Sequence, residues 1–261
     1  IPETDARGLE QIGDNYVRQG NPTMAFLQYE KALAKEPKLQ SARYKRGMLL
    51  LSRGMNDEAL KTFDEILAQD PRYAPALEGR GRVRMAAGDF GGAMECFNEA
   101  LAADPKLWQV HALKGYLYDR RRDYDAAIAE YEKGIAVNGK SGMLFNNLGM
   151  SLYLKKDYPK AIDAYVKAVR IDSANRRVFN NLGLALFKVG RYDEALQAFR
   201  QGGDEAAAYN NMGCLYLAEK KHPEAKAAFE KAISLKPSYF ARARENLKKT
   251  EAAIVSAPAT P

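Results

Sequence analysis

The sequence predicts an all-α fold, a solenoid of seven helical hairpins closed by a capping helix. The first observation is a glycine that recurs every 34 residues, with one final interval of 30. The second is an alanine 12 residues after each glycine and an aromatic residue 16 residues after it. A fixed period of about 34 residues is typical of stacked helical hairpins. The glycines are Gly13, Gly47, Gly81, Gly115, Gly149, Gly183 and Gly213.

Close packing between the two helices of each hairpin explains this pattern. Glycine and alanine have almost no side chain, so two helices can approach closely at these positions. The aromatic residue, from Tyr29 in the first unit to Phe229 in the last, then fills the space between them. One hairpin cannot bury its apolar face alone, and each unit therefore needs a neighbour.

Each unit is expected to contain a first helix, a short turn and a second helix. In order, the units span residues 6–39, 40–73, 74–107, 108–141, 142–175, 176–205 and 206–239. Turns are expected where Gly, Asn and Asp lie between the helices. They are Gly20-Asn21, Gly54, Gly88-Asp89, Asp123-Tyr124, Asp157-Tyr158, Gly190-Arg191 and Lys221-His222. A proline ends the second helix in several units, at Pro37, Pro71, Pro105 and Pro237.

The sixth unit is four residues shorter than the others, because its second helix runs directly into Gly202-Gly203-Asp204. Asp204 is well placed to cap the next helix. A tolerated deletion or a built-in hinge would both explain the short unit, and a local change of pitch is expected there. After Pro237, residues 240–255 predict a capping helix, which a solenoid needs over its last apolar surface. Residues 256–261 are expected to be a disordered tail.

The repeat pattern resembles the tetratricopeptide repeat family over residues 6–239. The resemblance implies a right-handed superhelix, with the first helices lining a concave groove that binds peptides or helices. Family members use an asparagine two residues before the glycine to hold a peptide main chain. Asn147, Asn181 and Asn211 occupy that position in three consecutive units, and each follows another asparagine. An amide both donates and accepts hydrogen bonds, so these residues either grip an extended backbone or tie one helix to the next.

Other positions expected to face the groove carry cations and aromatic rings. The cations expected to bind a peptide are Arg177 and Lys188, with Lys45 and Arg82 as weaker extensions. Tyr116 and Tyr153 offer aromatic contact, as does Phe187, although Tyr153 and Phe187 could instead pack against neighbouring helices. The family's carboxylate clamp, a set of lysine, arginine and asparagine over three units, is incomplete here, so recognition of chaperone C-termini is not supported.

Net charge supports an acidic partner for the second half of the chain. The chain carries +7 overall, with a balance of −1 over residues 1–130 and +8 over residues 131–261. Such a distribution favours an acidic partner or an anionic membrane surface, unless the lysines only solvate the outer face. The basic run at residues 120–122 has no stacking aromatic residues around it, and nucleic-acid binding is not expected.

No arrangement of residues indicates an enzyme, a cofactor or a metal site. Residues 134–141 fit the spacing of a phosphate-binding loop, but that loop requires a preceding strand and the residues here belong to a predicted helix. His111 and His222 have no cysteine or carboxylate at ligand spacing. The sequence therefore predicts a non-enzymatic scaffold that binds a peptide or protein segment.

A narrower resemblance concerns residues 203–213 and 237–247, which follow the shortened repeat. They resemble the tetratricopeptide lipoproteins of bacterial tight-adherence pilus assembly. This implies a role in assembling a secretion pore at the periplasmic side of the outer membrane, through a lipid anchor upstream of Ile1. The start at Ile1-Pro2 suggests that an upstream segment was removed. Two alternatives remain, namely the recognition domain of a larger enzyme and a cytoplasmic chaperone for secreted proteins.

Overall fold

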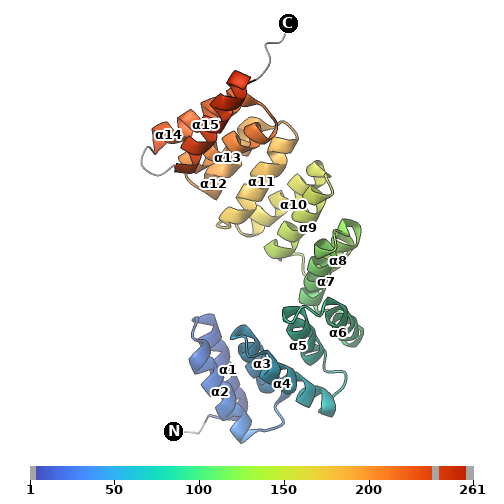
Figure 1. The fold of residues 1–261 in the computed structure, drawn as a ribbon. Coiled ribbons are helices and arrows are strands. Elements are labelled where there is room, and N and C mark those ends of the chain that lie inside the picture. The colour runs from blue at the N-terminus through green and yellow to red at the C-terminus, as the bar shows by residue number, and fades with distance from the viewer. Residues whose placement is uncertain (1–3, 237–240, 257–261) are drawn as a thin grey trace. The chain divides into compact units, whose positions relative to one another are not determined.

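The structure, a computed structural model, describes residues 4–236 and 241–256. Fifteen helices and no strand occur within these ranges (Figure 1), which confirms the predicted all-α fold. The chain forms two compact units, residues 1–117 and residues 118–261, and the division falls within helix α7. Odd-numbered helices are called first helices and even-numbered helices second helices.

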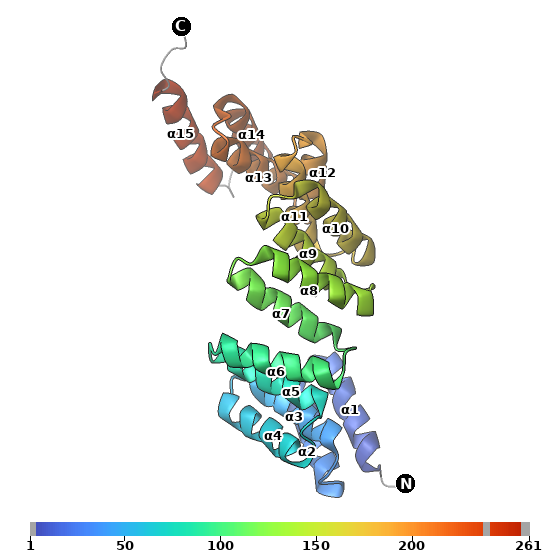
Figure 2. The same ribbon diagram turned by 90° about the vertical axis from the view of Figure 1, so that its right-hand side faces the viewer.

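Unit 1 contains three complete hairpins and most of α7. Its helices are α1 (Ala6–Arg18), α2 (Pro22–Lys35), α3 (Gln40–Ser52), α4 (Asn56–Gln69), α5 (Ala74–Ala86), α6 (Phe90–Ala103) and α7 (Trp108–Arg120). Consecutive helices pack against each other from α1 to α6 (Figure 2). The core of this unit is built around the fully buried rings of Phe63 and Phe97, with Val110 and Leu117 from α7.

Unit 2 begins with the last residues of α7, and its last described helix is not part of a hairpin. Its helices are α8 (Tyr124–Val137), α9 (Gly142–Leu154), α10 (Tyr158–Ile171), α11 (Arg176–Lys188), α12 (Tyr192–Gly202), α13 (Glu205–Ala218), α14 (His222–Leu235) and α15 (Ala241–Ser256). Helix α15 packs on α14, where Ala243 joins Ala225 and Phe229 in a buried cluster. It thereby covers apolar surface at the end of the unit. The disordered tail was predicted for residues 256–261, but Ser256 is the last residue of α15. Residues 257–261 and the predicted stop at Pro237 lie outside the described residues.

The repeated glycines allow the first helix of a hairpin to lie directly against the aromatic ring of the second. A Cβ atom placed on Gly13 would lie 2.4 Å from the Tyr29 ring. The same atom on Gly149 or Gly183 would lie 2.7 Å from the ring of the corresponding partner, Tyr165 or Phe199. Real Cβ atoms do not approach other atoms so closely in a close-packed interior. These glycines are therefore required by packing, as the sequence predicts.

Every hairpin turn contains one residue in the left-handed backbone region, seven residues after the repeat glycine. Four turns use glycine, with φ between 72° and 81°, at Gly20, Gly54, Gly88 and Gly190. The other three use Arg122, Lys156 and Lys220, with φ of 59°, 70° and 58°. The sequence prediction placed two of these turns at Asp123 and Asp157, which are instead N-caps of α8 and α10. A side chain in this region costs about 1–2 kcal/mol, so unit 2 carries strain at these turns.

Hydrogen bonds of Asn180 and Asp204 are among the interactions that hold the junction after the shortened sixth repeat. Helix α12 has 11 residues, whereas the other second helices have 14. Asn180 Nδ2 donates a hydrogen bond of 3.4 Å to the carbonyl oxygen of Gly202, the last residue of α12. Asp204 Oδ1 then accepts a hydrogen bond of 2.8 Å from the Ala207 N–H, which confirms the predicted cap of α13.

Gly149→Ala should destabilise the protein, because the added methyl group overlaps the Tyr165 ring. Overpacking of this kind costs about 1–3 kcal/mol. Chemical denaturation followed by circular dichroism measures the loss. Gly139→Ala is the matched control, because its Cβ would meet nothing closer than 3.5 Å, from the Ile135 carbonyl oxygen. Equal stability of the two variants would contradict the packing argument.

Lys156→Gly should stabilise the protein by up to about 1 kcal/mol, since glycine adopts the left-handed conformation without a Cβ clash. Lys156→Ala removes the same charge and the same side-chain atoms but keeps the Cβ, so it should remain close to the parent. The difference in denaturation midpoint between these two variants isolates the backbone effect. A glycine variant no more stable than the alanine variant would refute the assignment of strain.

Candidate functional site

Polar side chains link successive first helices within each unit. In unit 2, Asp119 of α7 accepts a hydrogen bond of 2.7 Å from the Ser151 hydroxyl of α9. Farther along, Lys188 of α11 lies 2.9 Å from Glu219 of α13. We refer to the surface formed by the first helices α9, α11 and α13 as the first-helix face of unit 2. Its polar links run from one first helix to the next, so this face is ordered before any partner binds.

The three predicted asparagines occupy equivalent positions on this face but have different environments. Asn181 is only 8% exposed, and its Nδ2 donates a hydrogen bond of 3.0 Å to Asn146 Oδ1 on α9. Asn147 is half-buried, and its Oδ1 accepts a hydrogen bond of 3.3 Å from Asn146 Nδ2. Asn211 is half-buried, and its side-chain amide makes no hydrogen bond to the described part of the chain. Asn181 therefore ties two helices together, while Asn147 and Asn211 keep hydrogen-bonding capacity for a ligand.

The two predicted cations of this face also differ. The hydrogen bond to Glu219 raises the pKa of Lys188 and lowers the pKa of Glu219. The charge of Lys188 is therefore already matched inside the protein. Arg177 is exposed and forms no ion pair with any residue in the described ranges. It is the predicted cation of unit 2 that remains available to an acidic partner.

The aromatic residues predicted to contact a ligand differ in their exposure and packing. Tyr153 is half-buried, its ring centroid lies 5.3 Å from that of Tyr158, and burial raises its pKa. Tyr116 is 44% exposed. Phe187 is 1% exposed and packs between Tyr192 and Tyr216, each 5.0 Å away between ring centroids. For Phe187 the packing alternative therefore holds, because its buried ring lies against Tyr192 of α12 and Tyr216 of α13.

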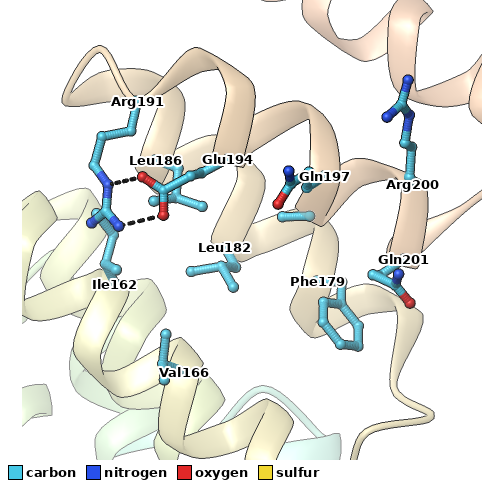
Figure 3. Close-up of a pocket in the computed structure, with 11 residues that line it drawn as sticks. Ile162, Val166, Phe179, Leu182, Leu186, Arg191, Glu194, Gln197, Arg200 and Gln201 are labelled. Atoms are coloured by element: carbon cyan, nitrogen blue, oxygen red, sulfur yellow. Dashed lines mark hydrogen bonds and ion pairs between the residues drawn. The ribbon is translucent and has the colours of Figure 1, made fainter.

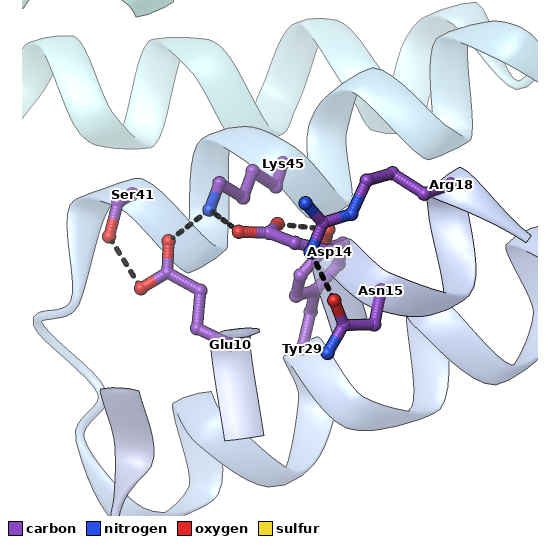
Figure 4. A network of polar contacts seen from close by, with 7 residues as sticks. All are labelled: Glu10, Asp14, Asn15, Arg18, Tyr29, Ser41 and Lys45. Carbon is purple, nitrogen blue, oxygen red and sulfur yellow. Dashed lines mark hydrogen bonds and ion pairs between the residues drawn. The ribbon is translucent and has the colours of Figure 1, made fainter. Parts of the chain in front are cut away.

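A polar network in unit 1 surrounds the predicted residue Lys45. Its Nζ lies 2.7 Å from Glu10 and 2.7 Å from Asp14, both on α1 (Figure 4). Asp14 also accepts a hydrogen bond of 2.8 Å from the Tyr29 hydroxyl. Burial lowers the pKa of Lys45, but its hydrogen bonds to Asp14 and Glu10 outweigh burial and raise the pKa overall. Lys45 is therefore a structural cation that joins α1 to α3.

Arg82, the other predicted cation of unit 1, is also paired. Its guanidinium lies 2.7 Å from Glu78, which is buried and also accepts a hydrogen bond of 3.3 Å from the Tyr44 hydroxyl. A cavity of about 410 Å³ opens beside this network, with Val17 and Met48 among its lining residues. Unit 1 thus offers a mostly apolar cavity, in which Lys45 and Asp14 are paired with each other while Arg18 bonds, among the described residues, only to the neutral amide of Asn15.

Sequence reasoning missed these internal pairs, although a signal for them exists. Asp14 and Lys45 are separated by 31 residues, as are Lys188 and Glu219. That separation is slightly less than one repeat and brings two residues onto neighbouring first helices. Opposite charges at such a separation would have predicted that both lysines are internally paired.

Several classes of site are absent from the described parts of the chain. Residues 4–236 and 241–256 contain no group of three or more His, Cys, Asp or Glu side chains that could hold a metal ion. No helix within these ranges is long and apolar enough to cross a membrane. The phosphate-loop spacing is a coincidence, because Gly134 lies inside α8 and Ser141 caps α9.

Sequence comparison identifies the family. Models of the tetratricopeptide repeat match residues 11–74, 44–107, 109–141 and 206–239, and a further TPR repeat model matches residues 149–190. Together these matches cover most of the chain. The chain belongs to the tetratricopeptide repeat family.

Solved structures show the same fold at low sequence identity. PilF of Pseudomonas aeruginosa is 20% identical with a TM-score of 0.63, over 82% of this chain and 96% of that one. A TPR repeat-containing protein from Cytophaga hutchinsonii is 19% identical with a TM-score of 0.65, over 91% and 98%. YrrB, described as a TPR protein with an unusual peptide-binding site, is 21% identical with a TM-score of 0.58, over 72% and 97%. None of the curated proteins is a significant match.

Asn181→Ala should cost about 0.5–1.5 kcal/mol of stability, because it removes the hydrogen bond to Asn146. Asn211→Ala should stay within about 0.5 kcal/mol of the parent, since no described residue bonds to that amide. Urea denaturation of both variants measures the difference. A reversed order would show that Asn211, and not Asn181, holds the helices together.

Proposed function

We propose that the chain is a protein-binding scaffold that holds an extended protein segment on the first-helix face of unit 2. Proteins of the tetratricopeptide repeat family bind protein or peptide partners, and many are non-enzymatic scaffolds. The observation that carries this proposal is the unused hydrogen-bonding capacity of two amides at one repeat position of α9 and α13. The Nδ2 group of Asn147 and the whole side-chain amide of Asn211 have no partner among the described residues.

Amides at a repeating position suit an extended backbone. Each peptide unit of the segment has one N–H donor and one C=O acceptor, and a side-chain amide complements both. Main-chain recognition gives affinity without requiring a particular side chain, and neighbouring residues then supply selectivity. Asn181 supports this arrangement indirectly, because its hydrogen bond fixes α11 against α9.

Acidic character in the partner is the second part of the proposal. Arg177 is exposed at the start of α11, and residues 131–261 carry a balance of +8. A guanidinium that is not paired within the protein can bind a carboxylate with two parallel hydrogen bonds. Lys188, Lys45 and Arg82 contribute less than the sequence suggests, because each already contacts a carboxylate of the chain.

The cellular setting that we propose is pilus or secretion assembly in a bacterial cell envelope. The resemblance of residues 203–213 and 237–247 to tight-adherence lipoproteins supports this setting. The proposed location is the periplasmic side of the outer membrane, with attachment through a lipid anchor upstream of Ile1. Fractionation of the native organism, with and without inhibition of lipoprotein processing, tests this location. Recovery in the cytoplasm alone would contradict it.

The double variant Asn147→Ala/Asn211→Ala should have an affinity for the partner that is lower by a factor of about ten or more. Each substitution removes the hydrogen bonds of one amide to the partner, and each such bond contributes about 1 kcal/mol net. A photo-crosslinking residue at position 211 identifies the partner segment in cells of the native organism. Fluorescence anisotropy with the synthetic segment then measures affinity. Asn98→Ala, on the exposed surface of α6, is the matched control. Unchanged affinity in the double variant, with the fold intact, would refute the proposed site.

A further inference from the structure

Two pockets lie on either side of α12 in unit 2, and no asparagine lines either of them. The α10–α12 pocket has a volume of about 490 Å³ and an apolar floor (Figure 3). Its floor consists of Ile162, Val166, Phe179, Leu182 and Leu186. The α12–α14 pocket has a volume of about 310 Å³. Its apolar and aromatic lining includes Tyr192, Leu196, Tyr209, Met212 and Tyr216.

The two pockets are the same structural feature in successive repeats. Phe179 and Tyr209 both stand four residues before the repeat glycine of their hairpin, Gly183 or Gly213. Leu182 and Met212 both stand one residue before it. Helix α12 therefore forms a ridge between two equivalent pockets, and a segment that crosses this ridge would meet both.

The charges around the α10–α12 pocket are already satisfied. Arg191 donates two hydrogen bonds to Glu194, of 2.7 and 2.5 Å, at one end of the pocket (Figure 3). Arg200 at the other end forms an ion pair of 2.7 Å with Glu205. What remains for a ligand is the apolar floor, which suits an apolar side chain.

The α12–α14 pocket has a different chemistry, because carboxylates at its rim are unmatched. Asp193 and Glu224 both line this pocket, are exposed, and form no ion pair with the described residues. Burial raises the pKa of the Tyr216 hydroxyl, as do the neighbouring Tyr192 and the Glu224 and Asp193 carboxylates, while Lys221 lowers it. Both negative charges are therefore close to one tyrosine ring of the pocket.

The aromatic rings of this pocket are held in place before a ligand arrives. Tyr192 and Tyr216 lie 5.4 Å apart between ring centroids and both pack on the buried ring of Phe187. The tendency of helix N-termini to attract carboxylates explains why Asp193 and Glu224 stand in first turns. It does not explain why each carboxylate borders a pocket lined by three tyrosines.

We propose that unit 2 binds a basic amphipathic segment of a protein partner across α12. An apolar side chain of the segment enters the α10–α12 pocket, and a Lys or Arg side chain enters the α12–α14 pocket. Lys221 and Arg200 of the chain already lie over the Tyr192 and Tyr209 rings, 4.8 and 5.8 Å from the ring centroids, so the rim carboxylates provide the main attraction for the cationic group. The methylene stem of the entering side chain covers apolar surface. Asp193 and Glu224 then pair with the cationic group. This surface uses residues of α10, α12 and α14 together with other residues of α11 and α13 than the asparagines, and it selects the opposite charge.

Synthetic peptides with one Leu and one Lys at graded separations are suitable probes, together with a matched series in which Glu replaces Lys. At least one peptide of the Lys series should bind and shift the methyl resonance of Met212, while the Glu series should not. Asp193→Asn/Glu224→Gln should weaken binding about tenfold or more. Asp163→Asn/Glu132→Gln is the control, because it removes two exposed carboxylates that line neither pocket.

Three results would overturn the proposal. The first is that no Lys peptide binds better than its Glu counterpart. The second is equal affinity of the Asp193→Asn/Glu224→Gln variant and the parent, with helix content unchanged. The third is loss of peptide binding in Asn147→Ala/Asn211→Ala instead, which would place the peptide on the first-helix face. Light scattering measures the oligomeric state of the parent and of the Asp193→Asn/Glu224→Gln variant. A parent dimer that dissociates in this variant would also contradict the proposal, because the surface would then be an interface between copies of the chain.

Discussion

The contact between a repeat glycine and an aromatic ring is the constraint on which the hairpins within each unit depend. The ring occupies the space that a Cβ atom would need, at distances of 2.4–2.8 Å for Gly13, Gly47 and Gly183. Because the ring is also buried, it sets the separation of the two helices in its hairpin. Glycine serves here through its size and not its flexibility, since these positions lie inside regular helices. Every other feature of a hairpin, from the turn to the cap, is built on this separation.

Polar contacts between first helices form a second level of organisation. Each contact joins one first helix to the next, as Lys45 joins α1 to α3 and Lys188 joins α11 to α13. These contacts use charges that would otherwise be available to a partner. The first-helix face therefore has a smaller set of binding groups than its composition suggests. Buried and half-buried pairs of this kind contribute more to the specificity of packing than to its strength.

The fold was predictable from sequence because the contact between glycine and an aromatic ring requires particular residue types at fixed positions of each repeat. A glycine, an alanine and an aromatic residue in register specify the hairpin, and Asp204 specifies the cap after the short repeat. The site was predictable only in outline. Asn181 and Asn211 are the same residue at the same repeat position, yet one is bonded to Asn146 and the other is not. Residue type alone does not encode such differences, because they depend on which side chain the neighbouring helix presents. The pockets beside α12 were not predicted, because the apolar residues that line them have the sequence pattern expected of buried core residues.

The non-glycine residues at the hairpin turns have a consequence for how unit 2 opens. Arg122, Lys156 and Lys220 hold a left-handed conformation that the glycines of the other turns adopt without cost. In a solenoid, stability is approximately a sum of terms for each repeat and for each interface between repeats. Local strain therefore lowers the free energy of opening of the hairpin that contains it. We therefore expect the backbone amides around Lys156 and Lys220 to exchange with solvent after only local opening of the turn. The unit thus combines firmly packed helix pairs with turns that yield first, and it can adjust there to a partner without losing its core.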